Sequence, residues 1–347
     1  MGGVGLRNIL VTGGAGFIGS NFLKMIVTKT DYNIVNLDKL TYAGNYDNIK
    51  GIINRHIFIK GDICDTVLLD SLFDKYDFDT VVNFAAESHV DRSIEEPDVF
   101  IQTNICGTQK MLDVCKKKWS LGKTIRDDVL FLQVSTDEVY GSLGKNGKFS
   151  EITPIAPNSP YSASKASADL LVKAYNHTYG LPVLITRCSN NYGPNQFPEK
   201  LIPLTIMNAL NDKKIPIYGD GKQIRDWIFV RDHCEGILTV LKKGLVGEVY
   251  NIGSENEWAN IDIVNLILEE MGKPKSLIEY VKDRPGHDTR YAIDNSKIKD
   301  KLGWKPKITF EKGMKETIQW YLDNQEWIND IVSGNYLKKY FDDKEKS

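Results

Sequence analysis

Two short groups of residues near the middle of the chain could carry chemistry. Tyr161 and Lys165 stand four positions apart at the start of a stretch with helical periodicity, which puts both side chains on one face of the helix. The lysine cation would stabilise the phenolate and lower the pKa of Tyr161, so the tyrosine could act as a base toward a hydroxyl group that is losing hydride. Upstream, a predicted strand ends in Thr136, Asp137 and Glu138. An acid beside a base suits an elimination, although an acidic pair at a helix start could instead only stabilise the helix dipole.

A glycine-rich turn near the start of the chain could bind phosphate. Gly13, Gly16 and Gly19 lie between an apolar run at 8–12 and a helical pattern, in the order G-x-x-G-x-x-G. We expect Gly13 to allow a tight turn, Gly16 to let the backbone approach a pyrophosphate, and Gly19 to let the helix pack closely on the sheet. This spacing differs from the G-x-G-x-x-G of the dehydrogenase fingerprint, so a purely structural turn is the alternative.

Acidic residues follow the next two predicted strands. Asp38 ends the second strand, where a carboxylate can accept both ribose hydroxyls and would repel a 2′-phosphate, so NAD is favoured over NADP. Lys39 beside it weakly favours NADP, unless it is a solvated loop lysine. Asp62 and Ile63 follow the third strand, where Asp62 could lie near the adenine or could cap a turn or a helix.

The elements that must position these residues alternate between strand and helix. Because the strands are apolar on both faces, they predict a parallel sheet covered by helices on both sides. The fold class is therefore α/β, a Rossmann-type doubly wound parallel sheet with a smaller, mixed C-terminal substrate-binding lobe. In such sheets ligands bind beyond the carboxyl ends of the strands. The predicted strands cover 8–12, 33–37, 57–60, 80–84, 129–134 and 183–187, and the predicted helices cover 66–75, 99–118 and 161–179.

The chain divides into three parts on this pattern. Residues 1–188 are expected to form the NAD-binding domain that carries the catalytic residues, and 189–330 mainly the substrate-binding lobe. The two are expected to be partly interleaved, because 248–252 again has the pattern of a buried strand. Helical periodicity runs through 310–329, and 331–347 forms a charged tail.

Composition excludes several classes of function. The 347 residues carry a formal net charge of −2, so no bulk attraction to nucleic acid or to an anionic membrane surface is expected. No apolar run approaches the ~18 residues of a membrane span and no secretory signal is evident at the start, so we expect a cytoplasmic protein. The 5 cysteines form no C-x-x-C and the 5 histidines lack ligand spacing, so reduced thiols and no metal site are expected.

The order of these motifs resembles a known family. The glycine turn, Asp38, the Ser135-Thr136 strand end and the Tyr-x-x-x-Lys pair together resemble the extended short-chain dehydrogenase/reductases, in which a Thr or Ser, the Tyr and the Lys form a triad. Further motifs narrow the resemblance to the nucleotide-sugar dehydratases of the dTDP-glucose 4,6-dehydratase family. These are TYAGN at 41–45, AAESHVDRS at 85–93, NNYGP at 190–194, RDW at 225–227 and DRPGHD at 283–288. The resemblance spans 8–322, and 119–128, 144–149 and the tail depart from it or lie outside it.

This resemblance implies a redox-neutral dehydration of dTDP-glucose to dTDP-4-keto-6-deoxy-glucose and water, as in the biosynthesis of rhamnose-type deoxysugars. Tyr161 would remove the O4 proton while NAD accepts hydride from C4, Glu138 would abstract the C5 proton, and Asp137 would protonate the departing 6-hydroxyl. The hydride would return to C6 and a proton would be restored at C5. Because no net redox change results, NAD would stay tightly bound and be regenerated in each cycle. Thr136 would bind the reacting hydroxyl, and Lys165 would also hold the nicotinamide ribose.

The resemblance also implies two sets of binding residues. For NAD they are Gly13, Gly16, Phe17, Ile18, Gly19, Ser20, Asp38, Lys39, Leu40, Thr41, Asp62, Ile63, Ala85, Ala86, Glu87, Ser88, Thr103, Tyr161, Lys165 and Asn191. For the substrate they are His89, Thr136, Asn190, Lys200, Leu201, Pro216, Ile217, Tyr218, Arg225, Asn260, Asp283, Arg284, Pro285, Gly286 and His287.

Residue chemistry agrees with part of the substrate set. Arg225 suits a diphosphate because its guanidinium offers a planar fork of donors, and a salt bridge with Asp226 is the alternative. His89, Lys200 and Tyr218 could equally be a core histidine, a solvated lysine and a core aromatic residue.

Two other functions stay open from the residues. An NAD-dependent sugar-nucleotide 4-epimerase or decarboxylase would share the NAD site, Tyr161 and Lys165, but would not need the adjacent acid and base. A non-catalytic NAD-sensing protein on the same fold would typically lack the tyrosine or the lysine. The resemblance further implies a homodimer formed through 99–118 and 161–179, while the sequence alone does not rank dTDP against UDP, GDP or CDP sugars.

Overall fold

The centre of the molecule is a seven-stranded parallel sheet. The computed structural model describes residues 8–283 and 287–337. The strand order is β12-β8-β7-β4-β1-β2-β3, and every neighbouring pair is parallel. The strands are β1 (Asn8–Thr12), β2 (Asn33–Asp38), β3 (Ile57–Lys60), β4 (Thr80–Asn83), β7 (Leu130–Thr136), β8 (Val183–Cys188) and β12 (Val249–Ile252). The predicted doubly wound α/β fold is confirmed.

The strand order creates a crevice at the carboxyl edge of the sheet. The chain runs outward from β1 through β2 to β3 and then returns to β4 on the other side of β1. The connections that follow β1 and β4 therefore diverge, which leaves space for a ligand between them.

Helices cover both faces because the strand residues alternate between two cores. Ile9 and Val11 belong to one core, whereas Leu10 between them belongs to the other. The first core is covered by α1 (Phe17–Lys29), α9 (Val230–Lys243) and α11 (Ser296–Leu302). The second is covered by α3 (Thr66–Tyr76), α6 (Thr108–Trp119) and α7 (Pro160–Tyr179).

The predicted helix at 99–118 is divided into three consecutive pieces. These are α5 (Pro97–Phe100), the π-helix η2 (Ile101–Gly107) and α6, and the short helix α4 (Val90–Glu95) precedes them. The wider turn of η2 brings Asn104 against the loop after β4, where its side chain accepts from the Glu87 N–H at 2.9 Å and donates to the Glu87 carbonyl at 3.0 Å.

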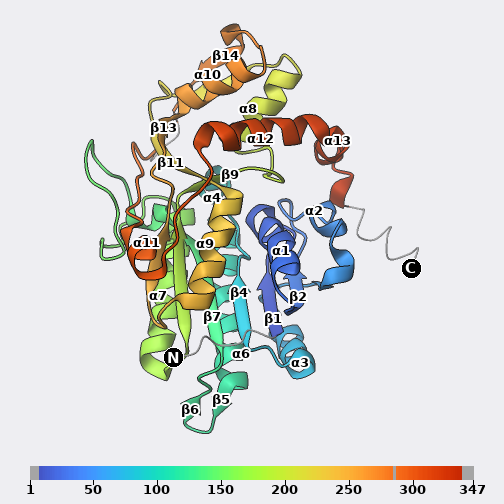
Figure 1. Ribbon diagram of the computed structural model, residues 1–347, viewed down its shortest axis with the longest axis vertical. Helices are drawn as coiled ribbons and strands as arrows, with labels where there is room; N and C mark the ends of the chain where they lie inside the picture. The colour runs from blue at the N-terminus through green and yellow to red at the C-terminus, as the bar shows by residue number, and fades with distance from the viewer. Residues whose placement is uncertain (1–7, 284–286, 338–347) are drawn as a thin grey trace.

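A smaller lobe lies over one end of the sheet, at the top of Figure 1. It holds a three-stranded sheet, a two-stranded parallel sheet and four helices around a third and a fourth core. The predicted helical run at 310–329 is interrupted at Asn324, which has φ −118° and ψ 47°, so it forms two helices. The elements are β9 (Asn190–Tyr192), β11 (Ile224–Phe229), β13 (Glu257–Ala259), β10 (Ile215–Tyr218), β14 (Ile278–Val281), α8 (Leu201–Leu210), α10 (Asn260–Glu270), α12 (Phe310–Asp323) and α13 (Gln325–Ser333).

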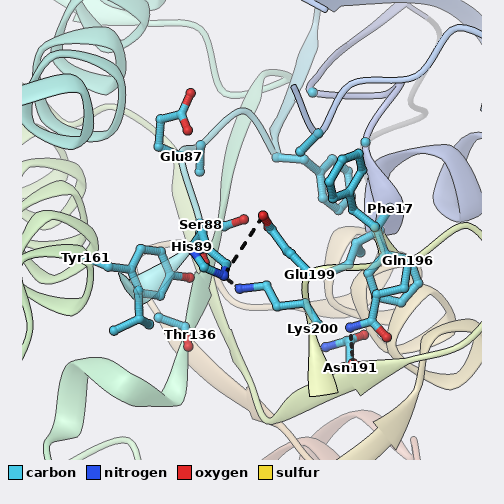
Figure 2. A pocket seen from close by; sticks show the side chains of 18 of the residues that line it. Phe17, Glu87, Ser88, His89, Thr136, Tyr161, Asn191, Gln196, Glu199 and Lys200 are labelled. Atoms are coloured by element: carbon cyan, nitrogen blue, oxygen red, sulfur yellow. Dashed lines mark hydrogen bonds and ion pairs between the residues drawn. The ribbon is translucent and has the colours of Figure 1, made fainter. Parts of the chain in front are cut away.

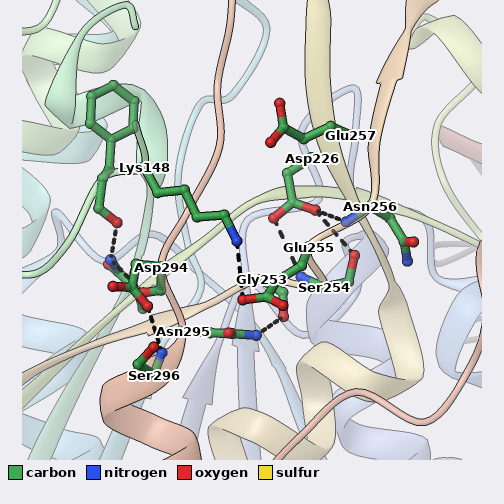
Figure 3. A network of polar contacts seen from close by, with 12 residues as sticks. Lys148, Asp226, Gly253, Ser254, Glu255, Asn256, Glu257, Asp294, Asn295 and Ser296 are labelled. Atoms are coloured by element: carbon green, nitrogen blue, oxygen red, sulfur yellow. Dashed lines mark hydrogen bonds and ion pairs between the residues drawn. The ribbon is translucent and has the colours of Figure 1, made fainter. Parts of the chain in front are cut away.

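The two parts are joined by a buried polar network, shown in Figure 3. Asp226 of β11 is fully buried and accepts from the Ser254 hydroxyl at 3.1 Å and the Asn256 N–H at 2.9 Å. Asn295 donates to the Gly253 carbonyl at 2.9 Å. These contacts fix the loop that leaves β12 of the large sheet, and they hold in register the strand that carries Arg225.

The segment 119–128, which departs from the family pattern, forms a small hairpin. Its strands are β5 (Ser120–Leu121) and β6 (Thr124–Ile125), which Figure 1 shows at the bottom of the molecule, below the sheet. The remaining short elements are α2 (Asp47–Lys50), η1 (Ile53–Arg55), η3 (Asp137–Tyr140) and η4 (Lys275–Leu277). Within the described part of the chain, no helix has the length and apolar character to cross a membrane.

Candidate active site

A large cavity lies at the carboxyl edge of the sheet, between the sheet and the smaller lobe. Its walls include the residues that follow β1, β2, β3, β4, β7 and β8, together with residues of α8, β10, β11 and α10. Of the predicted site residues in the described part of the chain, all except Ser20, Leu40 and Asp283 line this cavity. Arg284, Pro285 and Gly286 lie outside the described residues.

Three predicted residues have other contacts instead. The Ser20 hydroxyl donates to the Phe17 carbonyl within α1. Leu40 adopts φ 54°, and its N–H bonds to Asp38 at 2.8 Å. Asp283 Oδ1 lies 2.6 Å from Nδ1 of His287, so Asp283 orients a residue that lines the cavity rather than lining it itself.

The glycine turn is shaped as a dinucleotide site requires. Gly13 has φ +69°, and a Cβ there would lie 2.7 Å from the Ala85 backbone nitrogen. A Cβ on Gly19 would lie 2.2 Å from the Gly13 carbonyl oxygen, so the first turn of α1 can pack on the strand only with glycine. No described side chain caps α1 and its first turn holds no acidic residue, so its N–H groups and dipole suit a pyrophosphate.

Asp38 ties this turn to the end of β2. Its carboxylate accepts from the Ala15 N–H and the Leu40 N–H, each at 2.8 Å, and burial raises its pKa. Lys39 forms an ion pair with Asp62 at 2.7 Å. The lysine charge is therefore partly balanced by a carboxylate where a 2′-phosphate would have to bind. The residues of this half of the cavity fit NAD.

The predicted catalytic residues meet in the middle of the cavity. Figure 2 shows the Tyr161 ring and the Thr136 side chain next to each other. Thr136 ends β7 and caps η3 by accepting from the Glu138 N–H at 3.3 Å, so both carboxylates that follow it line the cavity. Lys165, one turn after Tyr161 on α7, donates to the Val134 carbonyl at 2.8 Å.

The electrostatics of the two carboxylates differ. Asp137 is only 1% exposed, and its Oδ2 atom has no hydrogen-bond partner among the described residues. Burial, and then the negative charges of Glu138 and Asp226, raise the pKa of Asp137 well above its usual value, while Arg225 opposes this. Asp137 is therefore suited to stay protonated beside the less buried Glu138.

The expected effect of Lys165 on Tyr161 is wrong for this structure. Burial, and then the charge of Glu138, raise the pKa of Tyr161 well above its usual value, and burial lowers the pKa of Lys165. The prediction considered only the charge of Lys165 beside Tyr161. In the structure both side chains are buried, and the negative charge of Glu138 also acts on the Tyr161 phenol.

The substrate half contains the buried Arg225. Its guanidinium donates to the Ile224 carbonyl at 2.8 Å and the Asp288 carbonyl at 2.9 Å, and lies 4.2 Å from the centre of the Tyr291 ring. Asp226 bonds to the loop after β12, and Arg225 lines the cavity.

Several cavity residues are missing from the sequence prediction. Glu199 is the most notable, because it places a further carboxylate in the cavity, with Oε2 at 3.9 Å from Nε2 of His89 (Figure 2). The sequence feature that could have identified Glu199 is its position directly before Lys200, a predicted substrate residue. The others include Ser135, Cys188, Ser189, Gln196, Phe197, Leu204, Trp227 and Tyr291.

A buried histidine fixes one of the predicted NAD residues. Asn191 Oδ1 lies 2.8 Å from Nδ1 of His233, and its amide donates to the Ser189 carbonyl at 3.0 Å. Burial lowers the pKa of His233 to about 3, so the ring is neutral and its Nδ1 carries the proton that Asn191 accepts. The orientation of the Asn191 amide is thereby set.

The family match and the sequence identity place the chain among the nucleotide-sugar dehydratases. The chain belongs to the family described as GDP-mannose 4,6 dehydratase, whose model matches residues 10–317. It is 58% identical over 339 residues to the dTDP-glucose 4,6-dehydratase of Xanthomonas campestris, a match that covers 94% of this chain and 96% of that relative.

Solved structures agree with this relationship. The dTDP-glucose 4,6-dehydratase of Bacillus anthracis in complex with NAD has a TM-score of 0.86 and 52% identity, over 94% of this chain and 99% of that chain. The UDP-glucose 4-epimerase of Thermotoga maritima with UDP-glucose has a TM-score of 0.84 but only 30% identity, over 92% of this chain and 100% of that chain. The fold is thus shared with epimerases, while sequence identity favours the dehydratases.

Proposed function

We propose that this chain catalyses the NAD-dependent dehydration of dTDP-glucose to dTDP-4-keto-6-deoxy-glucose. The observation that carries this proposal is the presence of Asp137 and Glu138 in the same cavity as Thr136 and Tyr161, beside a half that fits a dinucleotide. An epimerase needs the latter two but not the adjacent acid and base. The dehydratase relatives also exceed the epimerase in identity, 58% against 30%.

The glycine turn and Asp38 would hold NAD, which would supply a hydride acceptor for C4 of the sugar and a hydride donor for C6. Tyr161 takes the proton of the C4 hydroxyl as hydride leaves C4. Burial and Glu138 raise the pKa of Tyr161, and the hydrogen bond with Thr136 opposes them by lowering it. Thr136 also holds the C4 hydroxyl in place by a hydrogen bond. The resulting ketone acidifies the neighbouring C5–H bond, so Glu138 can remove that proton. Asp137 then gives its proton to the C6 hydroxyl, which departs as water. As hydride returns to C6, Glu138 gives the abstracted proton back to C5, so the sequence is redox-neutral.

The buried environment assigns the acid and the base. Because Asp137 is more buried than Glu138 and its pKa is raised by two carboxylates, it is the group that carries a proton to give away. Its unpartnered Oδ2 atom is positioned to donate once a hydroxyl group enters the cavity. The two roles therefore follow from two environments on consecutive residues.

The proposed binding sets extend from this centre. NAD would lie along the glycine turn, Asp38 and the loop at 85–88, with Asn191 beside the nicotinamide. The diphosphate would lie at Arg225, and Tyr218, at 40% exposed, would contact the nucleobase. We assign 1–188 to NAD binding and catalysis and 189–330 mainly to the sugar nucleotide, with β12 as the interleaved strand. The tail predicted at 331–347 would have to begin later, because α13 continues to Ser333 and both Ile331 and Tyr336 are buried in the third core.

The homodimer is also proposed. Apolar side chains are exposed along α5, η2 and α7, with Val99 at 38%, Ile101 at 49% and Leu170 at 55%. An exposed apolar strip on adjacent helices suits a two-fold interface. Leu170→Lys should convert the dimer to a monomer in light scattering, and a wild-type mass of one chain would refute the proposal.

A cytoplasmic location is proposed from the free thiols Cys64, Cys106, Cys115, Cys188 and Cys234. Cell fractionation tests it.

Product analysis tests the activity. Incubation with dTDP-glucose should produce a 4-keto-6-deoxy sugar that absorbs in alkali, and dTDP-galactose as the sole product would refute the proposal in favour of an epimerase. Parallel reactions with the UDP, GDP and CDP sugars determine the preferred nucleobase.

A further inference from the structure

We propose that Tyr42 and Arg92 form a positioning bridge that holds the Glu199 carboxylate in the sugar half of the cavity and links it to the loop that binds the adenosine of NAD. This inference rests on the proposed function, because it takes NAD and a nucleotide sugar as the two ligands. None of the three residues was predicted as a site residue, and Tyr42 is not among the described residues that line the cavity.

The bridge joins segments that are remote in the sequence. Tyr42 lies between Thr41 and Ala43, both of which line the dinucleotide half. Its hydroxyl donates to Oε1 of Glu199 at 3.0 Å, across a separation of 157 residues. Glu199 lines the cavity and is 18% exposed, and its other oxygen faces His89 at 3.9 Å. Tyr42 therefore fixes one oxygen of the Glu199 carboxylate, and the other oxygen lies beside His89, a predicted substrate residue.

The Tyr42 ring is fixed from several sides. The Arg92 guanidinium stacks 3.9 Å from the ring centre, and the Phe197 ring meets it edge-on at 5.5 Å. The Tyr336 hydroxyl donates to the Tyr42 carbonyl at 2.6 Å. A ring fixed in this way can direct its hydroxyl to one acceptor, so the geometry of Glu199 depends on the loop that carries Tyr42.

The charged surroundings of Glu199 give the bridge an electrostatic role. The groups that face it are Tyr42, His89 and Lys200, with Arg92, Glu87 and Tyr336 behind them. Burial raises the pKa of Glu199 most, and Glu87 adds to this, while Lys200, the Tyr42 hydroxyl and Arg92 lower it. The bridge thus favours the ionised carboxylate. An ionised carboxylate only accepts hydrogen bonds, which suits the hydroxyl groups of a hexose.

The test compares the pH profile of kcat/KM for dTDP-glucose in wild type, Tyr42→Phe and the control Tyr280→Phe. Tyr42→Phe keeps the ring under Arg92 but removes the donor, so the acidic limb should move to higher pH by about one unit. The NAD content of the purified protein should stay that of the wild type, since the loop keeps its packing. Tyr280, 60% exposed on β14, should leave the profile unchanged when replaced by Phe.

A double-mutant cycle separates positioning from general destabilisation. In a Glu199→Gln background the amide no longer titrates, so adding Tyr42→Phe should not shift the acidic limb further. An unshifted limb in Tyr42→Phe, or an equal shift in both backgrounds, would overturn the inference. Wild-type protein that does not convert dTDP-glucose would instead overturn the proposed function, so the two failures are distinguishable.

Discussion

Replacing Asp137 by Asn separates the proposed acid from the proposed base. The side chain is 1% exposed and one of its oxygens has no partner, so the amide fits the same space but has no acidic proton to give. Loss of a general acid costs about 10²- to 10⁴-fold in rate, which corresponds to roughly 3–5 kcal/mol of transition-state stabilisation. We expect the 4,6-dehydration of dTDP-glucose to slow by this factor.

The assay follows the C5 proton as well as the product. In deuterated water, mass spectrometry of the recovered dTDP-sugar should show that Asp137→Asn still exchanges the C5 proton, because Glu138 and the oxidation at C4 are intact. Glu138→Gln is the matched control and should lose both the exchange and the product. Wild-type turnover in Asp137→Asn, or loss of the C5 exchange in that variant alone, would refute the assignment of acid and base.

The same variant has a predicted effect on stability. The pKa of Asp137 is higher in the folded protein than in the unfolded chain, so the unfolded chain releases this proton first as the pH rises. Above an unfolded pKa of about 3.9, the carboxyl group therefore destabilises the fold increasingly until its folded pKa is reached. Asp137→Asn removes this cost, and its Tm at pH 7 should equal or exceed that of the wild type. A Tm several degrees lower would show that Asp137 has a structural role.

Three further variants test other parts of the site and the fold. Gly19→Ala should abolish retention of NAD, measured by its release on denaturation, because the new Cβ would lie 2.2 Å from the Gly13 carbonyl oxygen; a full NAD content would contradict this. Arg225→Lys should raise the KM for dTDP-glucose about tenfold or more while NAD stays bound, because lysine lacks the planar fork of hydrogen-bond donors. An unchanged KM would show that Arg225 does not bind the diphosphate. Asp169→Asn should destabilise the protein by about 3–5 kcal/mol in urea unfolding, because it leaves the fully buried Arg187 guanidinium, now 2.8 Å from Asp169, without its counter-charge. A change below 1 kcal/mol would mean that the pair contributes little.

The parts of the site that the sequence could predict depend on short-range patterns. The turn at Gly13 and the strand end at Thr136 are continuous segments whose structure follows from local sequence and from the ends of buried strands. The central sheet follows for the same reason, since β1 and β3 were placed with the observed bounds.

The unpredicted parts depend on contacts between distant segments. Glu199 enters the cavity only because α8 and the loop before it fold back over the sheet, and nothing local marks Tyr42 as its donor. The raised pKa of Tyr161 likewise comes from burial and a neighbouring carboxylate, which spacing along a helix does not reveal. The π-helix at 101–107 was also missed, because its wider turn reflects the packing of Asn104 against Glu87 rather than the helical periodicity.

The central claim is that hydride leaves C4 and returns to C6 within one enzyme. Incubation with dTDP-glucose deuterated at C4, followed by NMR of the product, tests this most directly. The account predicts that the deuterium is found at C6 of the 4-keto-6-deoxy sugar. Product that has lost the deuterium to solvent would contradict it.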